Sequence, residues 1–259
     1  MPGFRNPGGC LGRGVTQPLP RVLLVEDDAS ICRFVQLALE DSGVDLVLAG
    51  SLAAAIAALR TGPFVLILCD LMLPDGSGFD LLRSLAETDA PSPGMRRVAF
   101  SAGVSAESRQ RLHQLGVHEV LAKPASLAAL LACVQGAVAA SQASAPSTPA
   151  SAVGAADDAV ATYFGGNRQL YESFLVQCRE QWRRDAQLGD LALQHGDLQA
   201  LRRLAHSLKT VLTTLGLAAD GALARSLESA AAEGQAEAAG TLWPRLRAQL
   251  LTHAAAPPA

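Results

Sequence analysis

The stretch Phe64 to Gly78, FVLILCDLMLPDGSG, organises the first half of this chain. Six apolar residues end in a carboxylate, Asp70, and the turn-forming residues Pro74-Asp75-Gly76 follow. A continuous apolar run between turn residues predicts a strand buried on both faces, and such strands belong to parallel sheets. In open parallel sheets, functional groups gather beyond the carboxyl ends of the strands, so Asp70 is a candidate functional residue. The competing interpretation of Asp70 by itself is a turn or helix cap.

Apolar runs and helix-like periodicity alternate on both sides of this stretch. Strands are expected over residues 21–25, 44–49, 64–69, 96–100 and 117–122, and helices over 29–40, 52–59, 79–85, 106–115 and 127–140. Such alternation is typical of a mostly parallel sheet with helices on both faces. The sequence therefore predicts an α/β domain with a doubly wound, five-stranded parallel sheet over residues 21–140.

Polar residues follow the expected strands where they end. They are Glu26, Asp27 and Asp28 after the first strand, Asp70 after the third, Ser101 after the fourth and Lys123-Pro124 after the fifth. Taken singly, Asp28 could cap a helix, Ser101 could close a turn and Lys123 could lie in solvent. Right-handed crossovers, however, bring all of them to one edge of the sheet. Packed carboxylates repel by roughly 1 to 4 kcal/mol per pair at 4 Å, which calls for a cation, and oxygen ligands suit Mg²⁺.

This combination resembles the receiver domain of two-component response regulators. The matching residues are Asp27 and Asp28 as the acidic pair, Asp70 as the phosphoacceptor, Pro74 and Gly78 in the next loop, Ser101 as the switch hydroxyl and Lys123-Pro124 as the lysine step. The resemblance implies a flavodoxin-like fold and a phosphoryl group that Asp70 takes from a phosphohistidine of another protein. It also implies Mg²⁺ held by Asp27 or Asp28, by Asp70 and by the backbone carbonyl of Met72.

One position departs from the family pattern. The family usually carries an aromatic residue three positions before the lysine, and this chain has Val120 there. Because no ring is present to rotate, we expect a muted conformational change on phosphorylation. A large shift of amide resonances across the last two strands with an acyl-phosphate mimic would contradict that expectation.

The composition restricts the compartment and the partners. With 259 residues the chain is long enough for two domains, and its net charge of −3 offers no basic surface for nucleic acid. Five scattered cysteines without a CxxC pair suggest neither a disulfide framework nor a zinc site, which favours a reducing cytoplasm. Residues 1–20, rich in Gly and Pro, are expected to form a disordered arm. No run approaches the ~20 apolar residues needed for membrane insertion.

The second half of the chain has a different pattern. Residues 141–156, SQASAPSTPASAVGAA, read as a linker that spans roughly 20 to 25 Å as a flexible coil, so contact between domains is allowed but not required. Helical periodicity follows over 157–164, 167–194, 197–214, 217–232 and 235–253. This predicts an all-α antiparallel bundle, a four-helix bundle over residues 157–254 with a tail at 255–259.

Leu198 to Leu215 carries the most informative histidine of the bundle. Its apolar residues form one stripe, and at roughly 100° per residue His206 lies about 200° from Leu208, facing solvent beside Lys209. The segment AHSLKTVLTTLG, with ARSLESAAAEG after it, resembles histidine-containing phosphotransfer (HPt) domains. The resemblance implies that His206 carries a phosphoryl group and that Lys209 helps to neutralise it. The usual glycine after the lysine is Thr210, which we expect to slow or restrict docking of a partner receiver.

Together the two resemblances predict a two-component phosphorelay intermediate without its own ATP-binding kinase domain, and not an enzyme. The donor would be a sensor or hybrid histidine kinase, and the acceptor the receiver of a downstream response regulator. An aspartyl-phosphate phosphatase is disfavoured because its usual second Asp is Met72 here. A phosphorylation-independent regulatory adaptor remains an alternative because of Val120 and Thr210. The direction of flow, and whether transfer from Asp70 to His206 is internal, stay open.

Overall fold

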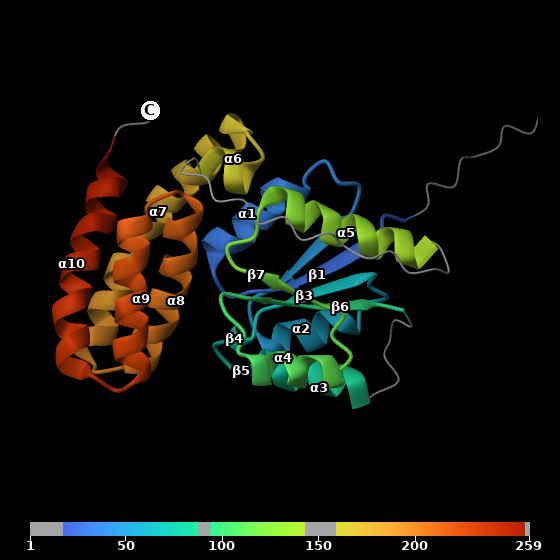
Figure 1. The fold of residues 1–259 in the computed structure, drawn as a ribbon, viewed down its shortest axis with the longest axis horizontal. Coiled ribbons are helices and arrows are strands. Elements are labelled where there is room, and N and C mark those ends of the chain that lie inside the picture. The colour runs from blue at the N-terminus through green and yellow to red at the C-terminus, as the bar shows by residue number, and fades with distance from the viewer. Residues whose placement is uncertain (1–17, 88–93, 143–158, 257–259) are drawn as a thin grey trace, which may run out of the picture.

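Five parallel strands form the sheet of the first domain in a computed structural model that describes residues 18–87, 94–142 and 159–256 (Figure 1). The strand order is β2-β1-β3-β6-β7, which is the predicted doubly wound arrangement. The strands are β1 (Arg21–Val25), β2 (Asp45–Ala49), β3 (Leu66–Cys69), β6 (Arg96–Ser101) and β7 (Glu119–Ala122). Most of the expected arm and linker lies outside the described residues; Ser141 and Gln142, which we expected in the linker, end the last helix of this domain.

Helices cover both faces of the sheet, as the alternating pattern predicted. One face carries α1 (Ala29–Leu39) and α5 (Leu127–Gln142), and the other carries α2 (Leu52–Leu59), α3 (Gly78–Glu87) and α4 (Ala106–Gln114) (Figure 1). Successive strand residues point to opposite faces, so β1 supplies Val22 and Leu24 to the core under α1 and Leu23 to the core on the other side. The sheet is therefore buried on both faces.

A short hairpin that the sequence pattern did not predict follows Asp70. Its strands are β4 (Met72–Leu73) and β5 (Gly76–Ser77), paired antiparallel. Asp75 in the turn accepts hydrogen bonds from the backbone N–H groups of Leu52 and Ala53 at 2.8 and 3.0 Å, so it joins the hairpin to the start of α2. A Cβ on Gly78 would lie 2.0 Å from the carbonyl oxygen of Asp70, and only glycine lets α3 begin so close to that residue.

Five helices make up the second domain. They are α6 (Ala159–Phe164), α7 (Arg168–Gln194), α8 (Leu198–Thr214), α9 (Ala218–Ala232) and α10 (Ala236–Ala255), within about two residues of the predicted ranges. Asn167 and Asp197 cap α7 and α8 with their side chains, which explains where these helices begin. The ring of Trp243 packs directly on Gly189 of α7 and is buried.

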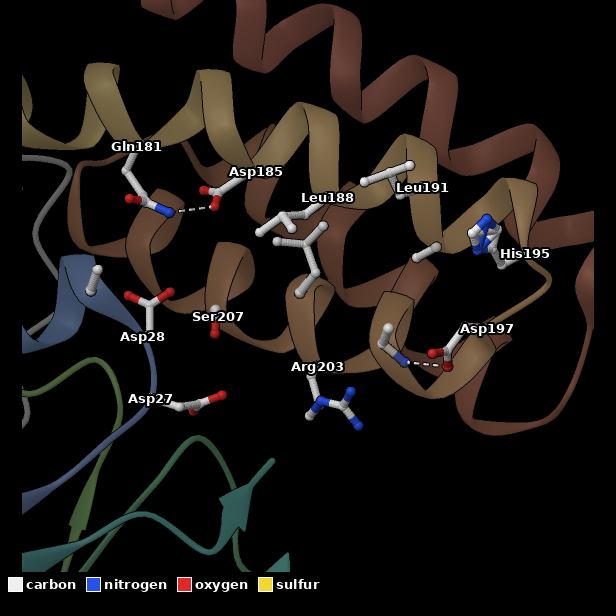
Figure 2. A pocket seen from close by; sticks show the side chains of 14 residues that line it. Asp27, Asp28, Gln181, Asp185, Leu188, Leu191, His195, Asp197, Arg203 and Ser207 are labelled. Carbon is white, nitrogen blue, oxygen red and sulfur yellow. Dashed lines mark hydrogen bonds between the residues drawn. The ribbon is translucent and has the colours of Figure 1, made fainter. Parts of the chain in front are cut away.

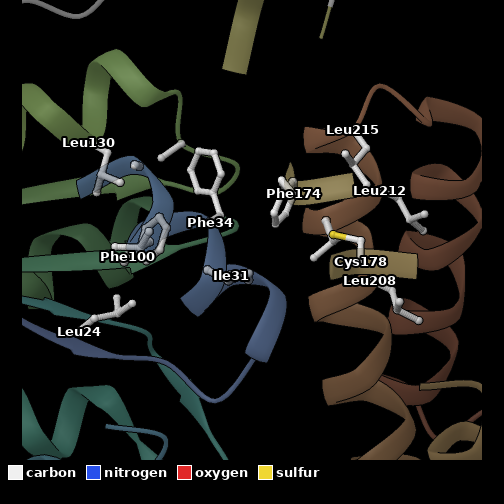
Figure 3. Close-up of a cluster of buried hydrophobic side chains, with 14 of the residues drawn as sticks. Leu24, Ile31, Phe34, Phe100, Leu130, Phe174, Cys178, Leu208, Leu212 and Leu215 are labelled. Carbon is white, nitrogen blue, oxygen red and sulfur yellow. The ribbon is translucent and has the colours of Figure 1, made fainter. Parts of the chain in front are cut away.

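The two domains share one apolar core. Helix α1 of the first domain packs against α7 and also reaches α8. The Phe34 ring meets the Phe174 ring edge-on, with centroids 5.5 Å apart (Figure 3). It also meets the Phe164 ring edge-on, with centroids 5.6 Å apart. Phe164 and Phe174 are 0% and 1% exposed, so these rings are buried between the domains. The linker length left contact between the domains open, and the structure shows that they are in contact. This contact holds the bundle beside the sheet of the first domain.

Candidate functional site

Three charged side chains are buried together at the carboxyl edge of the sheet. The Lys123 ammonium, after β7, lies 2.8 Å from Asp70 Oδ2 and also pairs with Glu26 Oε2. All three residues are at most 6% exposed. Burial by itself would lower the pKa of Lys123, but the carboxylates of Glu26 and Asp70 outweigh this effect and raise it. The lysine is therefore held in its charged form next to the carboxylate after β3.

Glu26, Asp27 and Asp70 form a group of carboxylates that could hold a metal ion. One oxygen from each lies within 4.8 Å of the others. Burial raises the pKa of both Glu26 and Asp27, and the neighbouring Asp70 raises it further, while Lys123 opposes the rise. An all-oxygen set that carries more negative charge than one lysine can offset fits a hard divalent cation such as Mg²⁺.

Asp28, which the sequence analysis placed in the metal site, has another position. Its Oδ1 accepts a hydrogen bond of 2.7 Å from the Ile31 N–H, so it is the N-cap of α1, and it is absent from the carboxylate group above. Glu26 takes its place there. Our sequence pattern included Glu26 among the residues after β1, whereas the resemblance assigned the acidic pair to Asp27 and Asp28. Glu26 is buried like the strand residues before it, but three acidic residues in a row do not show in the sequence where β1 ends.

The other predicted residues of this edge lie where the strand ends place them. Ser101 is the last residue of β6 and is 5% exposed. The Met72 N–H donates to Asp70 Oδ1 at 3.1 Å, which orients the carboxylate. Val120, in β7, is half-buried against the core under α2, α3 and α4. The roles of Ser101 and of the Met72 carbonyl stay predictions.

His206 on α8 does not face solvent, contrary to the expectation from its apolar stripe. It is 8% exposed, because partners outside its own helix cover it. Its Nδ1 lies 2.6 Å from Glu228 Oε1 of α9, and the other oxygen of Glu228 lies 2.6 Å from Lys209 Nζ. A helical wheel of α8 does not show what neighbouring helices contribute, so it could not reveal the contact with α9. Glu228 was not predicted. The first of the two acidic residues in ARSLESAAAEG was the signal available.

The contact with Glu228 decides which nitrogen of His206 carries a proton. Burial alone would raise the pKa of Glu228, but hydrogen bonds from His206 and Lys209 outweigh it and lower the pKa to about 2. An ionised carboxylate only accepts, so Nδ1 must donate. The lone pair of the neutral ring then lies on Nε2, which is buried and has no hydrogen-bond partner in the described residues. Nε2 is therefore the ring nitrogen whose lone pair is free.

A cavity of about 530 Å³ separates the carboxylate edge from the bundle (Figure 2). Asp27 and Asp28 line it from the first domain, and Asp185, Arg203 and Ser207 line it from α7 and α8. The Ser207 hydroxyl faces Asp28 and counters the rise in pKa that burial causes there. The residue next to His206 thus faces the edge that holds the buried carboxylates.

Two family models match separate parts of the chain. Residues 22–135 match the family model described as response regulator receiver domain, and residues 169–256 match the Hpt domain model.

Curated relatives share parts of this arrangement. The sensory/regulatory protein RpfC of Xanthomonas campestris is 30% identical over 212 residues, which cover 76% of this chain and 28% of that protein. The virulence sensor protein BvgS of Bordetella pertussis is 31% identical over 155 residues, 58% of this chain and 12% of that protein. The uncharacterized transcriptional regulatory protein YkoG of Bacillus subtilis is 31% identical over 117 residues, 45% of this chain and 50% of that protein. The chain thus spans half or less of the length of each of these relatives. Within the described residues, no helix is both long and apolar enough to cross a membrane.

Proposed function

The chain combines a response regulator receiver domain with an Hpt domain, which are phosphotransfer modules of two-component phosphorelays. On this premise we propose that Asp70 and His206 exchange a phosphoryl group within one molecule. The observation that carries the proposal is the docking of the bundle on the receiver. Ser207, the neighbour of His206, faces Asp28 at the edge that presents Asp70. The unpartnered Nε2 of His206 is the atom that such an exchange requires.

The receiver step uses a buried carboxylate as nucleophile. An Asp70 oxygen attacks the phosphorus of a donor phosphohistidine, the O–P bond forms, and the N–P bond breaks with its electron pair returning to the donor ring. Lys123, which already contacts Asp70 at 2.8 Å, offsets charge on the phosphoryl oxygens. Glu26, Asp27 and Asp70 would hold Mg²⁺, which when bound neutralises charge that builds up on the transferring group.

The second step reverses these roles at the bundle. The Nε2 lone pair of His206 attacks the phosphorus, the N–P bond forms, and the acyl O–P bond breaks to regenerate the Asp70 carboxylate. The ring becomes positively charged in this step, and Glu228 on Nδ1 stabilises that charge. Lys209 holds the other oxygen of Glu228 and thereby fixes its orientation. The phosphoryl group can also move in the opposite direction, from Nε2 of His206 to the Asp70 carboxylate.

Partners follow from this chemistry. A sensor or hybrid histidine kinase is the proposed source of the phosphoryl group, and the receiver of a separate response regulator is its proposed destination. BvgS and RpfC, named as a sensor and a sensory/regulatory protein, support a place in such a pathway. The alternative, a regulatory adaptor that works without phosphorylation, would keep the docking but not the transfer.

Radiolabelling separates the two functions. With a ³²P-labelled small acyl phosphate and Mg²⁺, the wild type should acquire alkali-labile label at Asp70 and then acid-labile label at His206. Asp70→Asn should abolish both labels, and His206→Gln should abolish only the acid-labile one. An adaptor predicts that all three proteins stay unlabelled.

A further inference from the structure

His206 is closed off in the docked molecule. The residue is 8% exposed, and its Nε2 has almost no accessible surface and no hydrogen-bond partner among the described residues. A phosphoryl group leaves Nε2 by direct transfer to an oxygen of the acceptor, so the acceptor must reach this atom. In the docked arrangement, no second protein has that access.

Ser207, the neighbour of His206 on α8, faces the receiver. Successive residues of a helix are about 100° apart, so Thr210 lies between His206 and Ser207 around α8. Ser207 faces Asp28, and Thr210 is 5% exposed although it is polar. The Thr210 hydroxyl donates to the His206 carbonyl at 3.3 Å, and in this way it is satisfied within its own helix. His206, Thr210 and Ser207 therefore form a polar strip along α8, and Ser207 at its edge faces the receiver.

The contact that holds the receiver there is apolar and well packed. Phe34 on α1 meets Phe164 and Phe174, and Cys178 on α7 is fully buried next to them (Figure 3). Ser30, one turn earlier on α1, faces the Cys178 thiol. Because several buried side chains make up this contact, we expect it to form and separate as one unit.

We propose that the chain's own receiver and the receiver of a second protein compete for this one face of the bundle, so that His206 passes its phosphoryl group onward only after the internal receiver has undocked. The inference rests on the proposed function. In the onward step the Nε2–P bond breaks, an O–P bond forms on the second receiver's aspartate, and the electron pair returns to Nε2 while Nδ1 keeps its proton. Phe34, Ser30 and Cys178 then control the output of the relay without touching the phosphoryl group.

A reversible covalent lock tests the proposal. Ser30→Cys in the full-length chain places a second thiol opposite Cys178, so that oxidation can join α1 to α7. The donor also carries Asp70→Asn and is labelled on His206 with ³²P-phosphoramidate before oxidation. The acceptor is the full-length chain with His206→Gln and Phe174→Ala, which loosens its own docking from the bundle side and leaves α1 intact. Ser30→Ala in the same Asp70→Asn donor, treated with the same oxidant, is the matched control.

Locking should slow transfer to the acceptor by at least about tenfold, because the rate follows the undocked fraction, and a reductant should restore it. The Ser30→Ala donor should transfer at one rate with or without oxidant. An equal rate from locked and reduced donors overturns the proposal, as does failure of the disulfide to form or of the reduced donor to transfer. A donor that takes up no label when reduced refutes the proposed function itself, which separates the two failures.

Phe34→Ala gives the opposite perturbation. It removes the ring that packs on Phe164 and Phe174 but leaves the bundle surface unchanged. In the Asp70→Asn donor it should raise the transfer rate to the acceptor, while in the chain with an intact Asp70 it should slow the internal exchange. A slower or unchanged transfer from the Phe34→Ala donor, with its helical content retained by circular dichroism, contradicts the competition.

Discussion

Replacing Glu228 by Gln should damage both the stability of the bundle and the chemistry at His206. The carboxylate accepts from His206 Nδ1 and from Lys209 Nζ, each at 2.6 Å. A glutamine offers one acceptor oxygen, and its amide N–H₂ would meet a second donor. One of the two contacts must therefore be lost, and the negative charge disappears from both.

The magnitude follows from the pKa of Glu228, which the two hydrogen bonds lower from its usual 4.5 to about 2 against the effect of burial. That difference corresponds to roughly 3 kcal/mol of stabilisation of the ionised form. We expect Glu228→Gln to lose about 2 to 3 kcal/mol, or roughly 5 to 10 °C in Tm. Because the folded-state pKa is the lower one, the stabilisation is complete above about pH 4.5 and is lost as the pH falls through about 2. The difference between wild type and variant should shrink over the same range.

Transfer to His206 should fall by about 10- to 100-fold, since a charge-assisted hydrogen bond of 1.5 to 3 kcal/mol is removed from the developing imidazolium. Ring ¹⁵N chemical shifts report the tautomer: the wild type should show Nδ1–H, and the variant a mixture. Glu237→Gln, at an exposed position in the first turn of α10, is the matched control and should change none of these quantities. A Glu228→Gln protein with wild-type Tm and an unchanged tautomer refutes the assignment of Nε2 as the nucleophile.

Three further predictions concern the receiver edge and the cavity beside it. Lys123→Met leaves two buried carboxylates without their cation, so the free energy of unfolding measured in urea should fall by about 3 to 5 kcal/mol, and Mg²⁺ should restore part of it. A variant as stable as wild type in the absence of Mg²⁺ would contradict the buried pairing. Asp27→Asn should abolish Mg²⁺ binding measured by calorimetry. Asp28→Asn, in which Asn is an equally good N-cap, should keep the Mg²⁺ affinity within about threefold of wild type. Loss of Mg²⁺ binding in Asp28→Asn but not in Asp27→Asn would return Asp28 to the metal site. Asp185→Asn should stabilise the protein at pH 8 by at most roughly 4 kcal/mol. Burial raises the pKa of Asp185 to about 7, so its ionisation lowers the stability of the wild type as the pH rises from about 4 to 7. A wild type whose stability does not decline relative to the variant over that range would refute this cost.

The first domain was predictable because each of its signals is local. The apolar run before Asp70 lies on both faces of a sheet, and the residues after each strand meet at one edge whatever the helices between them contain. The exception was the acidic pair. Whether Glu26 or Asp28 faces the edge depends on where β1 stops and α1 begins, and three acidic residues in a row do not reveal that boundary. In the folded chain the Ile31 N–H donates a hydrogen bond to Asp28, which makes Asp28 the N-cap of α1.

In the bundle, less of the candidate site could be predicted from the sequence than in the first domain. Its helices follow from their periodicity and caps, and His206 follows from its motif, but its environment depends on residues distant in the sequence. Glu228 lies on the next helix and the receiver more than fifty residues away, so no pattern along α8 contains them. The linker length likewise left docking undecided, since a flexible coil allows contact without favouring it.

Local patterns alone were thus enough for the two domains, for Asp70 at a strand end and for His206 on its helix, because strand alternation, helix periodicity and turn residues act over a few positions. Packing across the chain decided what those residues can do. Burial against Phe34 and its partners joins the domains, and the carboxylate of Glu228 selects the reactive nitrogen of His206. Both effects arise from contacts between side chains that only the folded chain brings together.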